Sequence, residues 1–235
     1  MSKTPISTPA EAAALAQTGW LVFFLRLTLL DVIKLTVRTR GGFWRKLWAL
    51  LSNMGGWFSN LVIAILQMLT FAGDWRSGMW QLIHVGVVIE KHGEKFLLEA
   101  TYPRVRLIPL EKRLEAYPVA HLVPPRLPHN GLVDEDEWQN WIQFVDDMPY
   151  NKFGLLGVLL NIGGGGSPGT RFCSQLAAEA YQILDWLPKR GVVLAVSRGA
   201  EPRATDIPAG WYEPSGLAMS RAALNWRGEL YVNTR

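Results

Sequence analysis

The sequence lacks the residues on which disulfide-rich and zinc-stabilised domains depend. It contains one cysteine among 235 residues, so no disulfide framework can form within the chain. The four histidines are scattered, and with a single cysteine they give no zinc-binding pattern. Charged residues are few, at 19%, whereas hydrophobic residues reach 49%, a balance that excludes a disordered chain. We therefore expect one folded domain with a sizeable core, with or without an appended segment.

Basic charge is concentrated toward the N-terminus. Residues 1–73 carry seven Lys/Arg and two Asp/Glu, a net charge of +5, whereas residues 74–235 carry seventeen and eighteen, a net charge of −1. Indole rings favour the membrane interface and cations are attracted to acidic headgroups. We therefore expect residues 1–73 to be a helical segment that binds a membrane surface or a protein partner. No nucleic-acid motif accompanies the charge, so nucleic acid is not an expected partner. Six of the eleven tryptophans fall in the first third of the chain, and this clustering also indicates an interface: Trp20, Trp44, Trp48, Trp57, Trp75 and Trp80.

Two or three helices are predicted in this segment, broken at Gly41-Gly42 and Gly55-Gly56. Residues 19–38 read as an amphipathic helix, because their charges fall on one side of a helical wheel. Residues 57–72 form an apolar stretch shorter than the roughly 20 residues that a bilayer needs. Packing on the rest of the protein or on another subunit is the favoured interpretation of this stretch, and a membrane span is the alternative. No secretory signal is recognised, so we expect a cytosolic, peripheral-membrane or particle-associated protein.

Residues 74–235 indicate an α+β domain with an antiparallel sheet packed on helices. Strands are predicted at 84–90, 95–100 and 105–108, with a hairpin turn at His92-Gly93. Helices are predicted at 134–147 and from Cys173 to residue 187, and a further strand at 191–197. The glycine-rich loop 163–169 lacks the lysine and Ser/Thr of a phosphate loop, so no phosphate site is expected there.

Cys173 and His84 are the residues best suited to chemistry. Cys173 lies at a predicted helix start, where free backbone N–H groups and the helix dipole favour a thiolate. The alternative is an inert buried cysteine, because Cys173 shares a helical face with Ala177 and Ala180. A thiol nucleophile needs a base, and His84 at the start of an apolar strand is the candidate.

The predicted hairpin tests whether a carboxylate orients His84. If Lys91 lies opposite Glu94, then His84 and Glu99 point to the same face and are diagonal neighbours across Gly86. Glu99 would then reach the imidazole and stabilise its charged form. A three-residue turn would reverse the parity and place Glu99 on the opposite face.

Several motifs resemble one protein family in their residues and their order. These are His84-Val85-Gly86-Val87-Val88, Leu98-Glu99-Ala100, Pro149-Tyr150-Asn151, Phe172-Cys173-Ser174-Gln175-Leu176 and Thr205-Asp206-Ile207-Pro208. They resemble the circularly permuted NlpC-like branch of the papain-like cysteine hydrolases, which includes YiiX-like proteins and the lecithin retinol acyltransferase group. In that branch the histidine precedes the cysteine, as it does here. The resemblance covers about residues 73–215.

The resemblance implies a permuted papain-like fold and a Cys-His-Glu triad. Cys173 would be the nucleophile, His84 the general base and then acid, and Glu99 the residue that orients His84. Tyr150 would line the cleft or donate to the oxyanion, and Ser174 would bind substrate. Asn151 and Gln175 stand where the family has carboxylates, so substrate contacts are expected to differ.

The implied activity is hydrolysis of a peptide amide, such as a cell-wall stem peptide, without metal or organic cofactor. A lipid-linked acyl group is the second substrate class, because residues 1–73 are basic and tryptophan-rich. The alternative from another class is a structural or assembly protein that retains the fold, for example in a virus particle or a membrane complex.

Overall fold

A single twisted sheet organises the protein in a computed structural model that describes residues 4–6, 8–70, 81–125, 135–151, 170–183, 226 and 228–233. The strand order in this part of the chain is β1-β7-β6-β2-β3-β4-β5. All neighbours are antiparallel except β1 and β7, which are parallel. The strands are β1 (Thr4–Ile6), β2 (Leu21–Leu25), β3 (Leu82–Lys91), β4 (Glu94–Thr101), β5 (Arg104–Pro109), β6 (Val119–Val123) and β7 (Leu230–Asn233).

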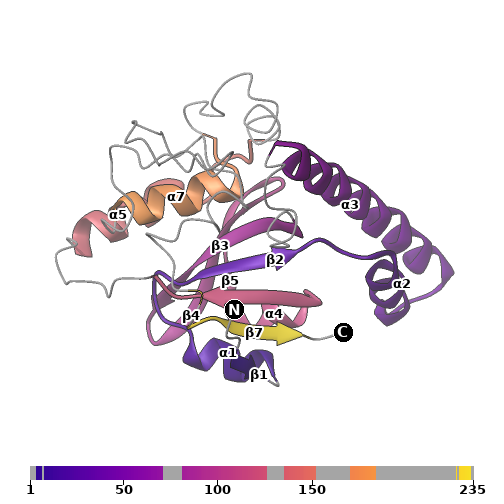
Figure 1. The fold of residues 1–235 in the computed structure, drawn as a ribbon, viewed down its shortest axis with the longest axis horizontal. Helices are drawn as coiled ribbons and strands as arrows, with labels where there is room; N and C mark the ends of the chain where they lie inside the picture. The colour runs from indigo at the N-terminus through magenta and orange to yellow at the C-terminus, as the bar shows by residue number, and fades with distance from the viewer. Residues whose placement is uncertain are drawn as a thin grey trace.

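Helices cover both faces of this sheet (Figure 1). On one face α7 packs with β3 and β4 around an apolar cluster that includes Phe23 and Val85. On the other face α1 and α4 cover a second cluster that includes Phe24 and Leu97. The mixed helix and sheet composition confirms the predicted α+β class. The helices are α1 (Pro9–Leu15), α2 (Leu29–Arg38), α3 (Phe43–Thr70), α4 (Leu110–Glu115), α5 (Glu135–Val145) and α7 (Cys173–Ile183).

Strand β2 corrects the prediction of one helix over residues 19–38. Its sequence Leu-Val-Phe-Phe-Leu pairs with β3 along one edge and with β6 along the other. The side chains on both of its faces are buried. A short apolar run of this kind has no periodicity that separates a buried strand from a helix. The helix begins only after Thr28, whose side chain and that of Asp31 form a capping box. The sheet therefore contains residues from both sides of the predicted division between 1–73 and 74–235.

Helix α3 corrects a second prediction. Gly41-Gly42 separates α2 from α3 as expected, but Gly55-Gly56 lies inside one continuous helix of 28 residues. A glycine inside a helix costs only about 1 kcal/mol relative to alanine, and the strong helix formers on either side outweigh that cost. Phe43–Ile65 is consequently long and apolar enough to cross a membrane, judged by length and composition alone.

The β3–β4 hairpin confirms the predicted register. Lys91 lies opposite Glu94 and Val87 opposite Leu98. His92 and Gly93 form the two-residue turn with φ values of 55° and 80°, the left-handed conformations that suit the twist of such a hairpin.

The predicted strand at 105–108 and the helix at 134–147 are present as β5 and α5, and the last predicted helix begins at Cys173 as α7. The loop at 163–169, the strand at 191–197 and the Thr205–Pro208 motif lie outside the described residues.

Candidate active site

Cys173 is the first residue of α7 and lies against the sheet. It is 1% exposed and belongs to the same core cluster as Ala177 and Ala180, the two alanines that share its helical face. Helix α7 makes its main sheet contacts with β3 and β4, the strands that carry His84 and Glu99. Helix α7 therefore packs against the two strands that carry the predicted base and the predicted carboxylate.

His84 and Glu99 are in direct contact. The Nε2 atom of His84 lies 2.9 Å from Oε2 of Glu99, as the hairpin register predicts. A glycine is required at position 86, two residues after His84 on β3, because a Cβ atom on Gly86 would lie 2.8 Å from the Leu97 side chain. The His84 ring also stacks on Phe24 of the neighbouring strand, with 5.6 Å between ring centroids. The contact with Glu99 uses the Nε2 atom of the ring.

Glu99 is a fully buried carboxylate surrounded by cations. Besides His84, it accepts hydrogen bonds from Nε of Arg113 at 3.0 Å and Nη2 of Arg106 at 3.4 Å. Burial, the largest effect, raises the pKa of Glu99, but the hydrogen bond and charge of His84 and then the charges of Arg113 and Arg106 outweigh it. The net result is a pKa of about 2. Glu99 is therefore ionised throughout the neutral range and can hold a charged imidazole.

His84 also interacts with Cys173. Burial, the largest single effect, lowers the pKa of His84, whereas the charge of Cys173 and a hydrogen bond with its side chain raise it. The hydrogen bond and charge of Glu99 act in the same direction, and the pKa rises from 6.5 to about 9. The imidazole keeps 14% of its side chain exposed. His84 and Glu99 of the predicted triad are in contact, and Cys173 is close enough to the imidazole to affect its pKa.

Tyr150 and Ser174 lie next to the sulfur. Burial, and after it the charge of Cys173, raises the pKa of Tyr150 well above its usual range, so its phenol stays protonated at neutral pH. Tyr150 is held by a backbone hydrogen bond from its N–H to Pro103 and by a bridge to Arg171, two residues before Cys173. Ser174 is fully buried and follows Cys173 in the first turn of α7.

Two site residues were missed by the sequence analysis, Arg113 and Arg106. Arg106 lies directly opposite Glu99 in the β4–β5 ladder, so extending the strand pairing by one step would have found it. Arg113 comes from α4, a six-residue helix that no sequence pattern predicted. Its guanidinium lies 4.9 Å from the centre of the Phe24 ring and 5.3 Å from that of Tyr117, so two aromatic rings position it.

Other features of the described residues lie apart from the triad. His121 on β6 and Glu229 beside β7 form a second buried histidine–carboxylate pair, which joins the two strands. A depression of about 310 Å³ lies between α5 and α7 and is lined in part by Trp141, Arg171 and Glu179. Within the described ranges, no three His, Cys, Asp or Glu side chains are grouped so that they could hold a metal ion.

Neither the protein-family models nor the curated protein sequences compared with this chain gave a match. The family resemblance therefore stays a prediction that rests on the motifs themselves.

Proposed function

We propose that the protein is a cysteine hydrolase of the permuted papain-like type, with Cys173 as nucleophile, His84 as acid and base, and Glu99 as the positioning carboxylate. The observation that carries the proposal is the position of the His84 imidazole, which contacts Glu99 at 2.9 Å and whose pKa is raised by the nearby Cys173. These side chains come from β3, β4 and the start of α7, as the order of the family motifs implies.

The first half of the reaction is acylation. Because the pKa of His84 is about 9, the imidazole is protonated at neutral pH. The proposed nucleophile is the thiolate form of Cys173 beside this imidazolium. The thiolate attacks a carbonyl carbon and forms the C–S bond. The backbone N–H of Cys173 at the start of α7 and the Tyr150 phenol are the proposed donors to the developing oxyanion. When the C–N or C–O bond breaks, the imidazolium gives its proton to the leaving amine or alcohol.

The second half is deacylation. Water attacks the thioester carbonyl and gives a proton to the now neutral His84, the C–S bond breaks, and the acid is released. Glu99 keeps the imidazole oriented through both halves and stabilises it each time it becomes charged. Since Cys173 is only 1% exposed, a substrate carbonyl reaches the sulfur only after neighbouring side chains move apart.

A peptide amide, such as a cell-wall stem peptide, is the leading substrate class because of the family resemblance. A lipid-linked acyl group is the second candidate, favoured by the basic and apolar surface of α2 and α3. Release of free amines from peptidoglycan without cleavage of lipid esters supports the first, and the reverse supports the second.

Burial of the sulfur also favours one alternative from another class, a structural or assembly protein that retains the fold without hydrolysis. Acylation of Cys173 separates the two. The full chain is incubated with p-nitrophenyl acetate and its mass is measured, for the wild type, His84→Asn and His92→Asn. His92 is a matched control because it lies in the exposed turn of the same hairpin, where asparagine tolerates the positive φ.

We expect an acetyl adduct on Cys173 in the wild type and in His92→Asn, and a rate at least about tenfold lower in His84→Asn. Equal acylation of His84→Asn and the wild type would contradict the proposed pair. Absence of both an adduct and p-nitrophenol release above background in the native wild type, with normal labelling of the sulfur in denaturant, would favour the structural alternative.

A further inference from the structure

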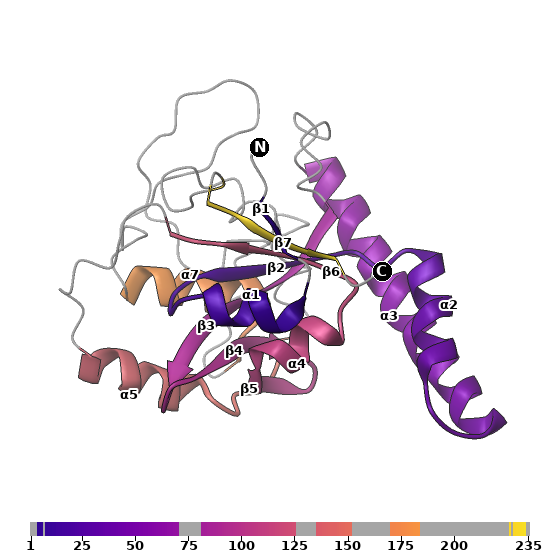
Figure 2. The same cartoon turned by 90° about the horizontal axis from the view of Figure 1, so that it is seen from below.

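Helices α2 and α3 form an antiparallel pair at one side of the molecule, here called the α2–α3 hairpin and comprising residues 29–70 (Figure 2). Its outer surface is unusually apolar. In the most apolar part of Phe43–Ile65 only 6% of the residues are buried. An uncovered apolar helix of this length marks an interaction surface.

Six of the exposed apolar residues of α3 form one continuous row. Successive members are three or four residues apart, except that Gly55 occupies the position between Leu51 and Phe58. On a helix this spacing places them within an arc of roughly 100°. Their exposed fractions run from 37% to 77%. We call this row the apolar stripe, and it consists of Trp44, Trp48, Leu51, Phe58, Val62 and Ile65.

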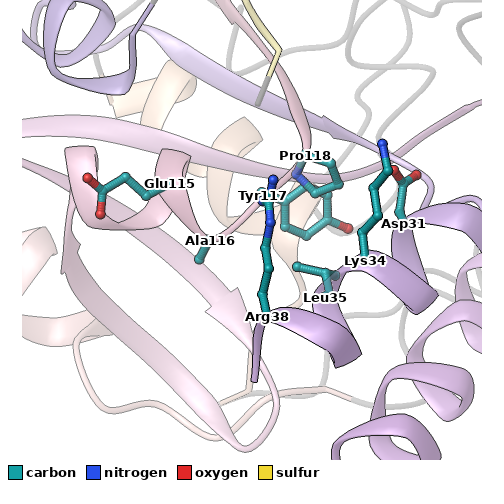
Figure 3. Close-up of a pocket in the computed structure, with 8 residues that line it drawn as sticks. All are labelled: Asp31, Lys34, Leu35, Arg38, Glu115, Ala116, Tyr117 and Pro118. Atoms are coloured by element: carbon teal, nitrogen blue, oxygen red, sulfur yellow. The ribbon is translucent and has the colours of Figure 1, made fainter. Parts of the chain in front are cut away.

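The opposite side of α3 is attached to the protein. Asn53 donates a hydrogen bond to Thr36 of α2 at 3.3 Å, and Asn60 hydrogen-bonds with Tyr117 between α4 and β6. Ala64 is fully buried. Figure 3 shows the adjoining contact, where Asp31, Lys34 and Arg38 of α2 lie beside Tyr117 and Pro118. The polar side of the hairpin thus already has its partner within the chain, which leaves the apolar stripe facing outward.

Charge indicates what covers the stripe. Residues 32–73 contain no Asp or Glu and five Lys/Arg. Four of these cations flank the turn that joins the two helices, at Arg38, Arg40, Arg45 and Lys46, and all four are exposed. A second copy of the chain would bring the same positive charge to the contact, so repulsion disfavours self-association. A bilayer with acidic headgroups offers an apolar interior and the opposite charge together.

We propose that the α2–α3 hairpin lies in the plane of an anionic membrane surface, with the apolar stripe inserted into the acyl boundary and Arg40, Arg45 and Lys46 at the headgroups. The tryptophans at the turn end of α3 then sit at the depth that indole rings prefer. The hairpin lies flat and does not span the bilayer, because the polar side of α3 remains hydrogen-bonded to α2 and to Tyr117. This binding does not depend on the proposed hydrolysis, and it is measured without a substrate.

The test is flotation of the full chain with vesicles of phosphatidylcholine, with and without phosphatidylglycerol. We expect binding to the phosphatidylglycerol vesicles that weakens in high salt. The double variant Trp48→Ser/Phe58→Ser is expected to lower the fraction bound at least about tenfold. Phe144→Ser is the matched control, because Phe144 is 63% exposed on α5, outside the hairpin, and it should leave binding unchanged.

Several outcomes would overturn the proposal. One is no binding to either vesicle, and another is equal loss of binding in the hairpin variant and in Phe144→Ser. A wild type that is dimeric without lipid, and monomeric in Trp48→Ser/Phe58→Ser, would assign the stripe to a second copy. Retention on the vesicles after a sodium carbonate wash would mean that α3 spans the bilayer, and would overturn the in-plane placement.

Discussion

Replacing Glu99 by Gln keeps the shape of the side chain and removes its charge from a site with no exposed surface. His84, Arg113 and Arg106 would then lose the carboxylate that they share. The lowering of the Glu99 pKa from 4.5 to about 2 corresponds to about 3 kcal/mol of folding free energy at neutral pH, at about 1.4 kcal/mol for each pKa unit. Removal of one partner from a buried ion pair costs about 3–5 kcal/mol. The two estimates agree, so we expect Glu99→Gln to lower the free energy of unfolding by about 3 kcal/mol.

The pH dependence of this loss has a definite sign. Because the folded pKa is below the unfolded one, the Glu99 contribution is complete above pH 4.5 and disappears as the pH falls from 4.5 toward 2. The difference between the wild type and Glu99→Gln should therefore be largest at pH 7 and clearly smaller at pH 3. Urea unfolding followed by tryptophan fluorescence measures both values.

Glu90→Gln is the matched control for this prediction. Glu90 carries the same side chain on the neighbouring strand and pairs with Lys95, but 45% of its side chain is exposed. An exposed pair contributes about 0–1 kcal/mol, so Glu90→Gln should change stability by less than about 1 kcal/mol. Equal losses for the two variants at pH 7, or a loss in Glu99→Gln that does not change with pH, would refute the electrostatic reasoning.

The same substitution should also change the pH profile of the proposed reaction. The hydrogen bond and charge of Glu99 help to raise the pKa of His84 to about 9, so the imidazolium and the ion pair it forms are lost as the pH rises through that value. In Glu99→Gln the alkaline limb of kcat/KM should move to lower pH, and kcat/KM at pH 7 should fall by roughly 100-fold. An unchanged limb would show that Glu99 does not act on His84.

Three further substitutions test the site and the fold. Cys173→Ser should abolish hydrolysis while the thermal unfolding midpoint stays within a few degrees, and residual activity would exclude Cys173 as nucleophile. Gly86→Ala should destabilise the fold by about 1–3 kcal/mol in urea unfolding, because its Cβ would lie 2.8 Å from Leu97 and 3.0 Å from the Leu98 carbonyl oxygen. Gly56→Ala meets no atom within 4 Å and should instead stabilise the protein, by up to about 1 kcal/mol. A loss of stability there would contradict the continuous α3 helix.

The contact between His84 and Glu99 could be predicted from the sequence because it is local. A two-residue turn fixes the register of the hairpin, and the period of two along each strand then fixes which side chains share a face. The same reasoning extends to Arg106, which lies opposite Glu99 across the next strand pair.

Strand β2 shows where such reasoning fails. Residues 21–25 are apolar throughout, and the sequence around them is compatible with a helix. Their strand conformation depends on β3 and β6, which are about 60 and 100 residues away along the chain and supply hydrogen bonds on both sides. Arg113 was missed because the six-residue helix that carries it is stabilised by packing against α1, β4 and β5 and not by a sequence pattern of its own.

Residue types and short-range periodicity determined the α+β composition, the hairpin register, the start of α7 at Cys173 and the basic, apolar character of the N-terminal helices. Tertiary structure decided the placement of β2 inside the sheet, the ring of cations around Glu99 and the approach of Cys173 to His84. The reason is that turns and strand parity act over a few residues, whereas burial of a carboxylate or a sulfur depends on which distant elements pack together. Tertiary structure also decided that the apolar stripe on α3 faces outward, because Asn53 and Asn60 on the opposite side of the helix hydrogen-bond with Thr36 and Tyr117.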